Sequence, residues 1–302
     1  MLDSNSISCC FTRRGNYDLI VGSKLKVAIH ELKVMLIDKT LIFFRDIIYC
    51  IERNFKLSGT QNMKIGLVVI ATNKYICFAK PLFDSMQRYF LNEPDIHRKM
   101  FLFTNQSAFD GPVVIYQKHE PWPFMTLKRY EIFHKNRQVF EEMDYLFYSD
   151  VDMIFKSHVG REILGERVAT KHPGYWRTPR CNFPYETNQL STAYISPNEG
   201  GHYYAGGFNG GKREIFLEMA RVISENIDKD LYNKYIAIWH DESHLNRYLI
   251  NHPPSLILDP SYCFPEASWA QDLPFSKILV ALDKNHDELR SHDIDLVMPV
   301  NL

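Results

Sequence analysis

Apolar residues change their spacing along this 302-residue chain, and the changes outline its expected elements. Short runs rich in β-branched and aromatic residues predict strands, whereas apolar positions three and four residues apart predict helices. From Met63 onward the two kinds alternate, which predicts an α/β fold with a largely parallel sheet. The strand-like runs are MKIGLVVIAT (63–72), KMFLFT (99–104) and PVVIYQ (112–117), and the helical ones are YICFAKPLFDSMQRYF (75–90) and MTLKRYEIFHKNRQVFEEM (125–143).

The first 62 residues show weaker, mixed periodicity and end in the linker-like stretch KLSGTQNM. Within them, residues 32–55 are rich in apolar side chains. A membrane-spanning helix needs about 18 or more apolar residues with few or no charges, and no such run survives here. We therefore expect no membrane-spanning helix and no signal peptide, although the pattern is compatible with peripheral membrane association. The interrupting charges are Asp38, Lys39, Arg45 and Asp46.

A strongly apolar run, YLFYSDVDMIF (145–155), contains two carboxylates, Asp150 and Asp152. Acids beside a core are unfavourable unless something neutralises them. Mn²⁺ or Mg²⁺ prefers oxygen ligands and can bridge carboxylates to the phosphates of a nucleotide. Ligands also bind at the carboxyl ends of strands in such sheets. The residues alone leave two interpretations open, a metal site and an ordinary polar turn.

The same D-x-D spacing occurs twice more, at Asp228/Asp230 and at Asp293/Asp295. The first of these pairs follows a helical pattern, and the second lies in a polar tail. We expect both to be solvated surface charge. Only the pair at the end of the apolar run has a strand context that favours a ligand site.

Two further stretches are unusual. GHYYAGGFNGGKREIF (201–216) places four glycines within six residues, and glycine content alone predicts a hairpin or loop. WHDESHLNRYL (239–249) resembles a helix start, where Asp241 and Glu242 would suit the positive end of the helix dipole. His240 and His244 share a helix face, as in zinc hydrolases, but that motif requires Glu after the first His. With no third ligand in view, packed core histidines are the more typical interpretation.

Composition argues against a nucleic-acid-binding protein and against a disulfide-stabilised one. The 35 basic and 36 acidic residues nearly cancel, which gives no electrostatic footprint for nucleic-acid binding. The cysteines form no C-x-x-C pair and no regular framework, so we expect free thiols in a reducing compartment. They are Cys9, Cys10, Cys50, Cys77, Cys181 and Cys263.

Five blocks, in this order and spacing, resemble glycosyltransferase family 6, which includes the histo-blood-group A and B transferases and the α-1,3-galactosyltransferases. The similarity runs from about Lys64 to Arg290. The blocks are DYLFYSDVDMIF…HVGREIL, KHPGY, YYAGGFNGG, WHDESHLNRYL and DKNH.

The resemblance implies a GT-A fold over residues 63–302, with a Rossmann-like nucleotide-binding half and an acceptor-binding half in one domain. It implies retaining transfer of N-acetylgalactosamine or galactose from a UDP-sugar to the 3-hydroxyl of a galactoside, expected to be a fucosylated, H-antigen-like glycan. Mn²⁺ or Mg²⁺ is the expected cofactor. The alternative is a catalytically inactive module that binds a UDP-sugar or a glycan.

Site residues carry over by the same resemblance. Asp150 and Asp152 match the metal-binding D-x-D, and Glu242 matches the acid beneath the reacting sugar, as nucleophile or as stabiliser of positive charge. Acceptor contacts fall on His172, Trp239 and, less directly, Glu266. The expected nucleotide-sugar-binding residues are Ile70, Ala71, Thr72, Tyr75, Arg129, Asp150, Val151, Asp152, Ala205, Gly206, Gly207, Lys284 and Arg290.

Details of the resemblance suggest further expectations. Gly207 leaves room for a 2-acetamido group and so favours UDP-N-acetylgalactosamine. Where vertebrate members have Trp-Asp near the acceptor, this chain has Phe264 and Pro265, which puts the acceptor's identity in doubt. Both aspartates of the D-x-D are kept, which predicts metal dependence.

Bacterial members begin almost at the first strand. Residues 1–62 are therefore expected to be an N-terminal extension, either poorly ordered or translated from an early, mis-assigned start. For a bacterial protein the expected location is the cytoplasm or a membrane periphery, rather than a Golgi lumen.

Overall fold

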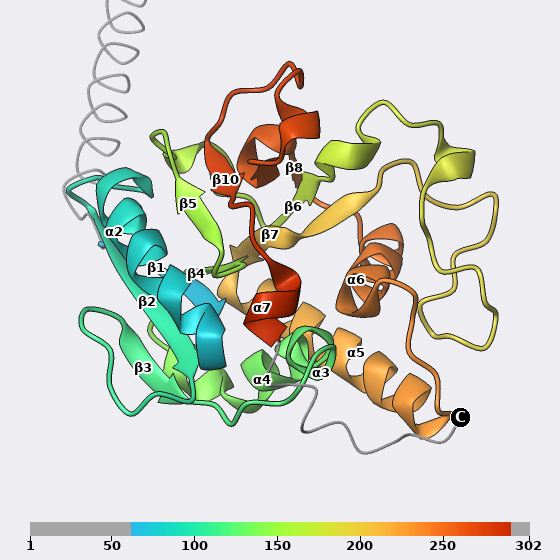
Figure 1. Ribbon diagram of the computed structural model, residues 1–302, viewed down its shortest axis with the longest axis horizontal. Coiled ribbons are helices and arrows are strands. Elements are labelled where there is room, and N and C mark those ends of the chain that lie inside the picture. Colours follow the sequence, from blue (N-terminus) through green and yellow to red (C-terminus); the bar gives the residue numbers. More distant parts are fainter. Residues whose placement is uncertain (1–61, 291–302) are drawn as a thin grey trace, which may run out of the picture. The chain divides into compact units, whose positions relative to one another are not determined.

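A seven-stranded sheet organises residues 62–290, the part of the chain that the computed structural model describes (Figure 1). Its strands are β1 (Met63–Ile70), β2 (Ile96–Thr104), β3 (Val113–Tyr116), β4 (Tyr145–Ser149), β6 (Arg167–Lys171), β7 (Tyr204–Lys212) and β8 (Leu256–Leu258). Their order is β3-β2-β1-β4-β7-β6-β8. The half from β3 to β4 is parallel, whereas β7 runs antiparallel to both β4 and β6. The predicted α/β fold with a parallel-rich sheet is confirmed.

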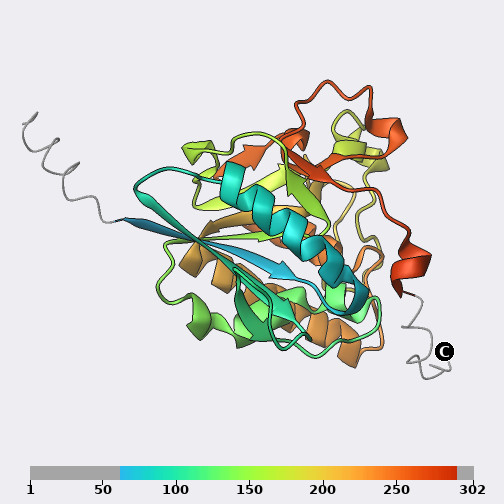
Figure 2. The same ribbon diagram turned by 60° about the vertical axis from the view of Figure 1, so that its left-hand side comes forward.

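Helices cover both faces of this sheet. They are α2 (Ala79–Tyr89), α3 (Phe124–Leu127), α4 (Arg129–Lys135), α5 (Arg213–Tyr232), α6 (His240–Asn251) and α7 (His286–Arg290). Figure 2 shows α2 on one side of the sheet and α4 and α5 on the other. In β1, Leu67 and Val69 pack into the core under α2, whereas Val68 packs into the core under α4, α5 and α6. Alternate residues of a strand point to opposite faces, so a continuous apolar run is what a doubly covered strand requires.

A second, three-stranded sheet connects the C-terminal segment to the end of β4. Its strands are β5 (Met153–Phe155), β10 (Leu279–Ala281) and β9 (Phe264–Pro265), in the order β5-β10-β9. Directly after β10, the amide of Leu282 donates to the carbonyl of Asp152 at 2.8 Å. This pairing brings residues some 130 positions apart in sequence to the same edge of the large sheet, because β5 follows β4 within a few residues.

The glycine-rich stretch forms the strand β7, so the hairpin or loop that its glycine content predicted is wrong. Residues 204–211 are all buried between β4 and β6. A methyl group on Gly210 would lie 2.5 Å from the carbonyl oxygen of Leu146 and would also meet the ring of Phe147. Gly211 has φ +145°, which L residues rarely adopt. Close packing, rather than a turn, explains these glycines.

The segment 125–143, expected as one amphipathic helix, is divided, and that expectation is wrong. It contains most of α3, all of α4 and the 3₁₀ helix Arg137–Phe140. Backbone angles leave the helical range at Lys128 (φ −94°, ψ 12°) and Asn136 (φ −100°, ψ 21°). Both the backbone amide and the side-chain amide of Asn136 donate to the carbonyl of Ile132, at 3.2 and 2.8 Å, where α4 ends.

Asp230 is buried, with 1% of its surface exposed, so its assignment to solvated surface charge is wrong. Its carboxylate accepts hydrogen bonds from the hydroxyl of Ser191 at 2.5 Å and the amide of Thr192 at 2.8 Å. It therefore fixes the loop before β7 to the end of α5. Asp228 is exposed, as expected.

Some expectations fall on residues 1–61 and 291–302, outside the described residues. These are the N-terminal extension with its apolar stretch, the first three cysteines and the acidic pair Asp293/Asp295. Within the described range, no helix is long and apolar enough to cross a membrane. Cys77, Cys181 and Cys263 are free thiols, as expected.

We expect Gly210→Ala to lower the free energy of unfolding by about 1–3 kcal/mol, because the added methyl group overpacks β7 against backbone that cannot move aside. Urea denaturation followed by tryptophan fluorescence measures the change. The matched control is Gly201→Ala, whose methyl group would have nothing within 4 Å and should change stability by less than about 0.5 kcal/mol. Equal stability of the two variants would contradict the packing of β7.

Candidate active site

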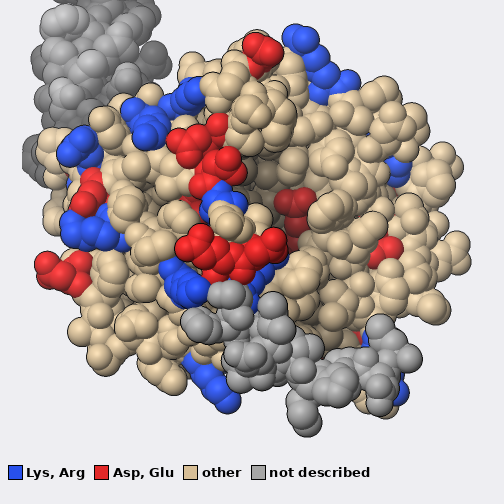
Figure 3. Space-filling model, in the orientation of Figure 1, with Lys and Arg blue, Asp and Glu red and all other residues tan. Residues whose placement is uncertain are grey.

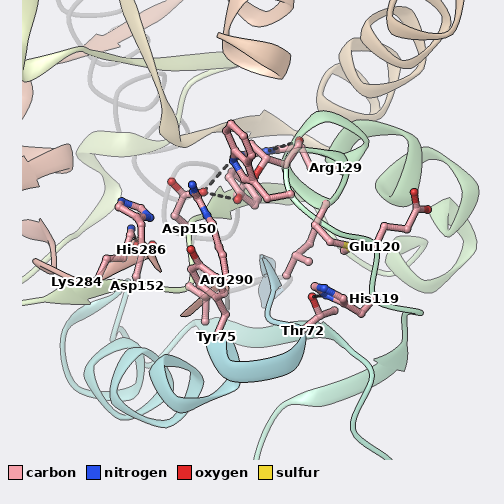
Figure 4. A pocket seen from close by; sticks show the side chains of 16 residues that line it. Thr72, Tyr75, His119, Glu120, Arg129, Asp150, Asp152, Lys284, His286 and Arg290 are labelled. Carbon is pink, nitrogen blue, oxygen red and sulfur yellow. Dashed lines mark hydrogen bonds and ion pairs between the residues drawn. The ribbon is translucent and has the colours of Figure 1, made fainter. Parts of the chain in front are cut away.

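A cavity of about 270 Å³ lies at the carboxyl ends of β1 and β4, where α/β sheets bind ligands. Figure 4 shows Asp152, Lys284 and His286 at one end and Thr72 and His119 at the other. Most of the expected nucleotide-sugar-binding residues line this cavity: Ile70, Thr72, Tyr75, Arg129, Asp150, Val151, Asp152, Lys284 and Arg290. The two acids, three of the first-strand residues and the C-terminal basic pair are thus brought together, and their roles in binding stay predictions.

Arg129, at the start of α4, is the buried centre of the site, with 6% of its surface exposed. Its guanidinium pairs with Asp150 at 3.1 Å and with Asp241 at 2.8 Å. It also donates to the carbonyl of Gly206 at 3.4 Å and lies 4.5 Å from the ring centre of Tyr148. Burial opposes the positive charge, but the surrounding acids outweigh it, so the pKa of Arg129 is raised. The side chain therefore links β4, β7 and α6.

Asp150 is held from several sides. Its Oδ1 accepts hydrogen bonds from Arg129 and from the hydroxyl of Tyr148, and its backbone amide donates to the carbonyl of Gly207 at 2.9 Å. Burial would raise the pKa of this carboxyl, but Arg129, Tyr148 and Lys284 outweigh burial and lower it. Asp150 is therefore a fixed carboxylate at neutral pH.

Asp152 provides the second carboxylate of the candidate metal site. Its side chain is nearly fully buried, and its Oδ2 has no hydrogen bond among the described residues but pairs with the ammonium of Lys284. A buried carboxylate in this state is suited to a cation. No cluster of three or more metal-binding side chains occurs in residues 62–290. Two carboxylates fit Mg²⁺ or Mn²⁺, which commonly complete their coordination with water and substrate phosphates.

Glu242 lies in the first turn of α6, and both of its oxygens are engaged. Oε1 accepts a hydrogen bond from the hydroxyl of Tyr203 at 2.7 Å, and Oε2 accepts one from the amide of Gly206 at 2.7 Å. Gly206 is followed by Gly207, the residue bonded to Asp150. Glu242 and Asp150 are thus bonded to neighbouring residues of β7, although Glu242 itself does not line the cavity.

The remaining expected residues lie around this centre. Ala71 is fully buried and donates its amide to the carbonyl of Phe103, and Ala205 is buried in β7. The ring centre of His172 lies 5.6 Å from that of Tyr203, the residue bonded to Glu242. Burial lowers the pKa of His172, and the charge of Glu242 opposes this shift. Their roles in binding stay predictions.

Two of the residues expected to contact the acceptor sugar are more exposed than His172 is. Trp239 immediately precedes α6, with 46% of its surface exposed. Glu266 is also exposed, and its Oε2 accepts a hydrogen bond from the amide of Asp283 at 3.1 Å. This contact ties Glu266 to the segment that carries Lys284. Its expected contact with the acceptor stays a prediction.

His240 and His244 have different neighbours. The ring of His240 lies 5.1 Å from that of Trp122, whereas Nε2 of His244 lies 3.6 Å from the carboxylate of Asp230. Burial lowers the pKa of His244 to about 4, against the opposing effect of Asp230. His244 is therefore a neutral buried side chain, but neither of its ring nitrogens makes a hydrogen bond in the described residues.

Sequence reasoning missed several residues of the site. Trp122 faces Arg290, whose guanidinium lies 4.6 Å from its ring centre. Cys263 lies beside Asp150 and Glu242, and burial together with these two acids raises the pKa of its thiol. No local pattern identifies such residues, because each reaches the site through long-range packing. Others missed are His119, Glu120, Tyr148, Tyr203, Asp241 and His286.

Charge is unevenly spread over the face that contains the cavity. Figure 3 shows acidic and basic side chains gathered in the region of β5 and α7, beside a hollow. The part of this face around α6 and the loop before β7 carries few charges. This face thus has one side on which both signs of charge gather and one side with few charges.

Comparison with known proteins agrees with this geometry. The sequence profile of glycosyltransferase family 6 matches residues 48–291, and so begins within the expected N-terminal extension. Globoside alpha-1,3-N-acetylgalactosaminyltransferase 1 of Mus musculus is 37% identical over 217 residues, which cover 68% of this chain and 62% of that protein. Histo-blood group ABO system transferase 1 of Rattus norvegicus is 35% identical over 255 residues, covering 80% of this chain and 72% of the rat protein.

The human globoside alpha-1,3-N-acetylgalactosaminyltransferase 1 is 35% identical over 246 residues, which cover 76% of this chain and 69% of the human protein. The match to the mouse protein spans less than two thirds of that relative's length. The family profile nevertheless covers well over half of the present sequence. This chain therefore belongs to glycosyltransferase family 6, and its domain is a glycosyltransferase domain of the GT-A type.

Proposed function

We propose that this chain is a retaining glycosyltransferase that moves N-acetylgalactosamine, or galactose, from a UDP-sugar to the 3-hydroxyl of a galactoside. One observation carries the proposal. Glu242 bonds to Gly206, and Asp150 bonds to the adjacent Gly207. A carboxylate for the reacting sugar and one acid of the pair for the leaving diphosphate are therefore bonded to adjacent residues of one strand, which supports a glycosyl transfer at this place.

Charge separation is the main barrier that the site would lower. As UDP departs, negative charge grows on the diphosphate while the sugar ring gains oxocarbenium character. Lys284 and Arg290 reach the cavity from the C-terminal segment, and Arg129 lines it from the start of α4. Arg129 is held by Asp150, Asp241 and Gly206 before reaction, so it would stabilise the leaving group without reorganising. The carboxylate of Glu242 would stabilise the opposite charge on the ring.

A divalent cation fits the pair Asp150 and Asp152. When bound, such a cation would act as a Lewis acid on the leaving diphosphate. Asp150 is already oriented by Arg129 and Tyr148, whereas Asp152 is compensated by Lys284. The protein thus supplies one rigid ligand and one whose present partner is a flexible ammonium group.

The acceptor would approach the site from its less charged side, near His172 and Trp239. A fucosylated galactoside is our proposed acceptor, since the rat relative is named as a histo-blood group transferase. Aromatic faces can stack on sugar rings, and Trp239 is exposed enough to do so. Phe264 is buried and Pro265 is half-buried; we propose that the acceptor contacts differ here from those expected for vertebrate members.

We expect Glu242→Gln to lower kcat by about 100-fold or more, because it removes the negative charge opposite the developing cation. Tyr203→Phe should lower kcat by about 10- to 100-fold, because one hydrogen bond that orients this carboxylate is lost. Initial rates of UDP release with a fucosylated galactoside measure both effects. In each variant, the affinity for UDP and the unfolding midpoint should stay near those of the unaltered protein.

Tyr232→Phe is the matched control for the loss of a tyrosine hydroxyl, since Tyr232 is 88% exposed on α5. Its kcat should be unchanged. A folded Glu242→Gln variant with full turnover would exclude the proposed mechanism. Binding of UDP-sugar by the unaltered protein without any turnover would instead favour an inactive binding module.

We expect turnover to require Mn²⁺ or Mg²⁺, and exhaustive chelation to abolish it. Asp152→Asn should remove the metal-dependent part of UDP affinity, as measured by calorimetry with and without Mn²⁺, because an amide is a weaker ligand for a hard cation. Asp228→Asn, at an exposed aspartate of another D-x-D, is the control and should bind UDP normally. Turnover that survives chelation would refute metal dependence.

We expect kcat/KM to be higher with UDP-N-acetylgalactosamine than with UDP-galactose, because position 207 has no side chain to occupy the room of the acetamido group. Parallel progress curves with the two donors and one acceptor measure the ratio. One methylene in a pocket commonly changes kcat/KM by about 10- to 200-fold. A clear preference for UDP-galactose would overturn the assignment of the donor.

A further inference from the structure

Three side chains surround position 207, and two of them, from different parts of the chain, are close, whereas Sδ of Met153 would be in ordinary contact at 3.6 Å. A methyl group on Gly207 would lie 3.1 Å from Oδ2 of Asp150 and 3.2 Å from Sγ of Cys263. Both distances are shorter than the 3.4 Å at which ordinary contacts of such a carbon begin. Even alanine at this position therefore requires a neighbour to move.

Asp150 cannot move freely. Its other oxygen, Oδ1, is bonded to Arg129 and Tyr148. The strands cannot separate easily either, because the amide of Asp150 donates to the carbonyl of Gly207 itself, at 2.9 Å. A methyl group on Gly207 would therefore displace the carboxylate of Asp150, which the proposed mechanism needs in its present position.

Cys263 forms the opposite wall. It ends the 3₁₀ helix Pro260–Cys263, and the next residue, Phe264, is buried and pairs with β10 through Val280. The backbone at Cys263 is therefore fixed, and its sulfur is the part that meets position 207. Because the thiol is a single-atom side-chain tip, replacing it changes the width of this wall without moving the rest of the site.

We propose that Gly207 and Cys263 act as a pair that determines donor specificity: the thiol closes the space beside Gly207, so the two residues together, and not position 207 alone, set the room given to the substituent on the second carbon of the donor sugar. This inference rests on the proposed function. It assigns Cys263 a role in choosing between a 2-acetamido sugar and a 2-hydroxy sugar.

A four-member mutant cycle tests the pair: the unaltered protein, Gly207→Ala, Cys263→Ala and the double variant. For each, kcat/KM is measured with UDP-N-acetylgalactosamine and with UDP-galactose. Calorimetry gives the affinity for UDP in the presence of Mn²⁺, and urea denaturation checks folding. Cys263→Ser, whose oxygen is smaller than sulfur, replaces the alanine variant if that variant does not fold.

With Cys263 present, Gly207→Ala should lower kcat/KM at least about tenfold for both donors and weaken UDP binding, because the methyl group displaces Asp150. In the Cys263→Ala background, the same change should cost little with UDP-galactose, because the methyl group can move into the space that the sulfur leaves. It should still be unfavourable with UDP-N-acetylgalactosamine. A shift of preference toward galactose would then appear only in the double variant.

The pair is refuted if Gly207→Ala has the same effect in both backgrounds, within about twofold. It is also refuted if Gly207→Ala alone changes donor preference while UDP binding is intact. Cys181→Ala, at an exposed cysteine, is the control for loss of a thiol and should alter neither donor ratio nor binding. If the unaltered protein turns over neither donor, the proposed function fails, but UDP affinity across the cycle still tests the coupling of Gly207, Cys263 and Asp150.

Discussion

The site depends on a buried guanidinium. Arg129 is taken out of water at the start of α4, which is unfavourable unless its charge is fully compensated. The compensation comes from Asp150 after β4, Asp241 in α6 and a carbonyl of β7. Three elements that are separate in the chain must therefore meet around one side chain. Removing Arg129 would leave Asp150 and Asp241 without their shared cation, so the interaction fixes the architecture of the site as well as its electrostatics.

The glycine-rich strand β7 packs directly against these charged residues, through the carbonyls of Gly206 and Gly207. A side chain at position 207 would press on Asp150, whereas a methyl group at position 206 would make only ordinary contact with Glu242, at 3.4 Å. The buried, close-packed Gly210 and Gly211 keep the same strand pressed between its neighbours. Glycine is commonly explained by conformational freedom, but in β7 most of the constraint is volume. This explains why a glycine-rich segment forms a central strand.

The small sheet provides the remaining charges. Through β10, the C-terminal segment returns to the end of β4 and brings Lys284 to Asp152 and Arg290 to Trp122. A cation delivered by a separate segment can compensate an acid before a nucleotide binds and can contact the nucleotide afterwards. Charges held at the end of the large sheet thus line one cavity together with charges delivered by the C-terminal segment.

The sequence by itself determined the alternation of strands and helices, because the periodicity of apolar residues is a local property of any element with a buried face. It also placed Asp150 and Asp152 at a strand end and, through family resemblance, identified Glu242 and most of the residues that line the cavity. Only the tertiary structure decided that β7 is a strand, that Asp230 is buried, that Tyr203 orients Glu242 and that Cys263 closes the space beside Gly207. Each of these joins residues far apart in the chain, and such contacts depend on how whole elements pack, which no local pattern encodes.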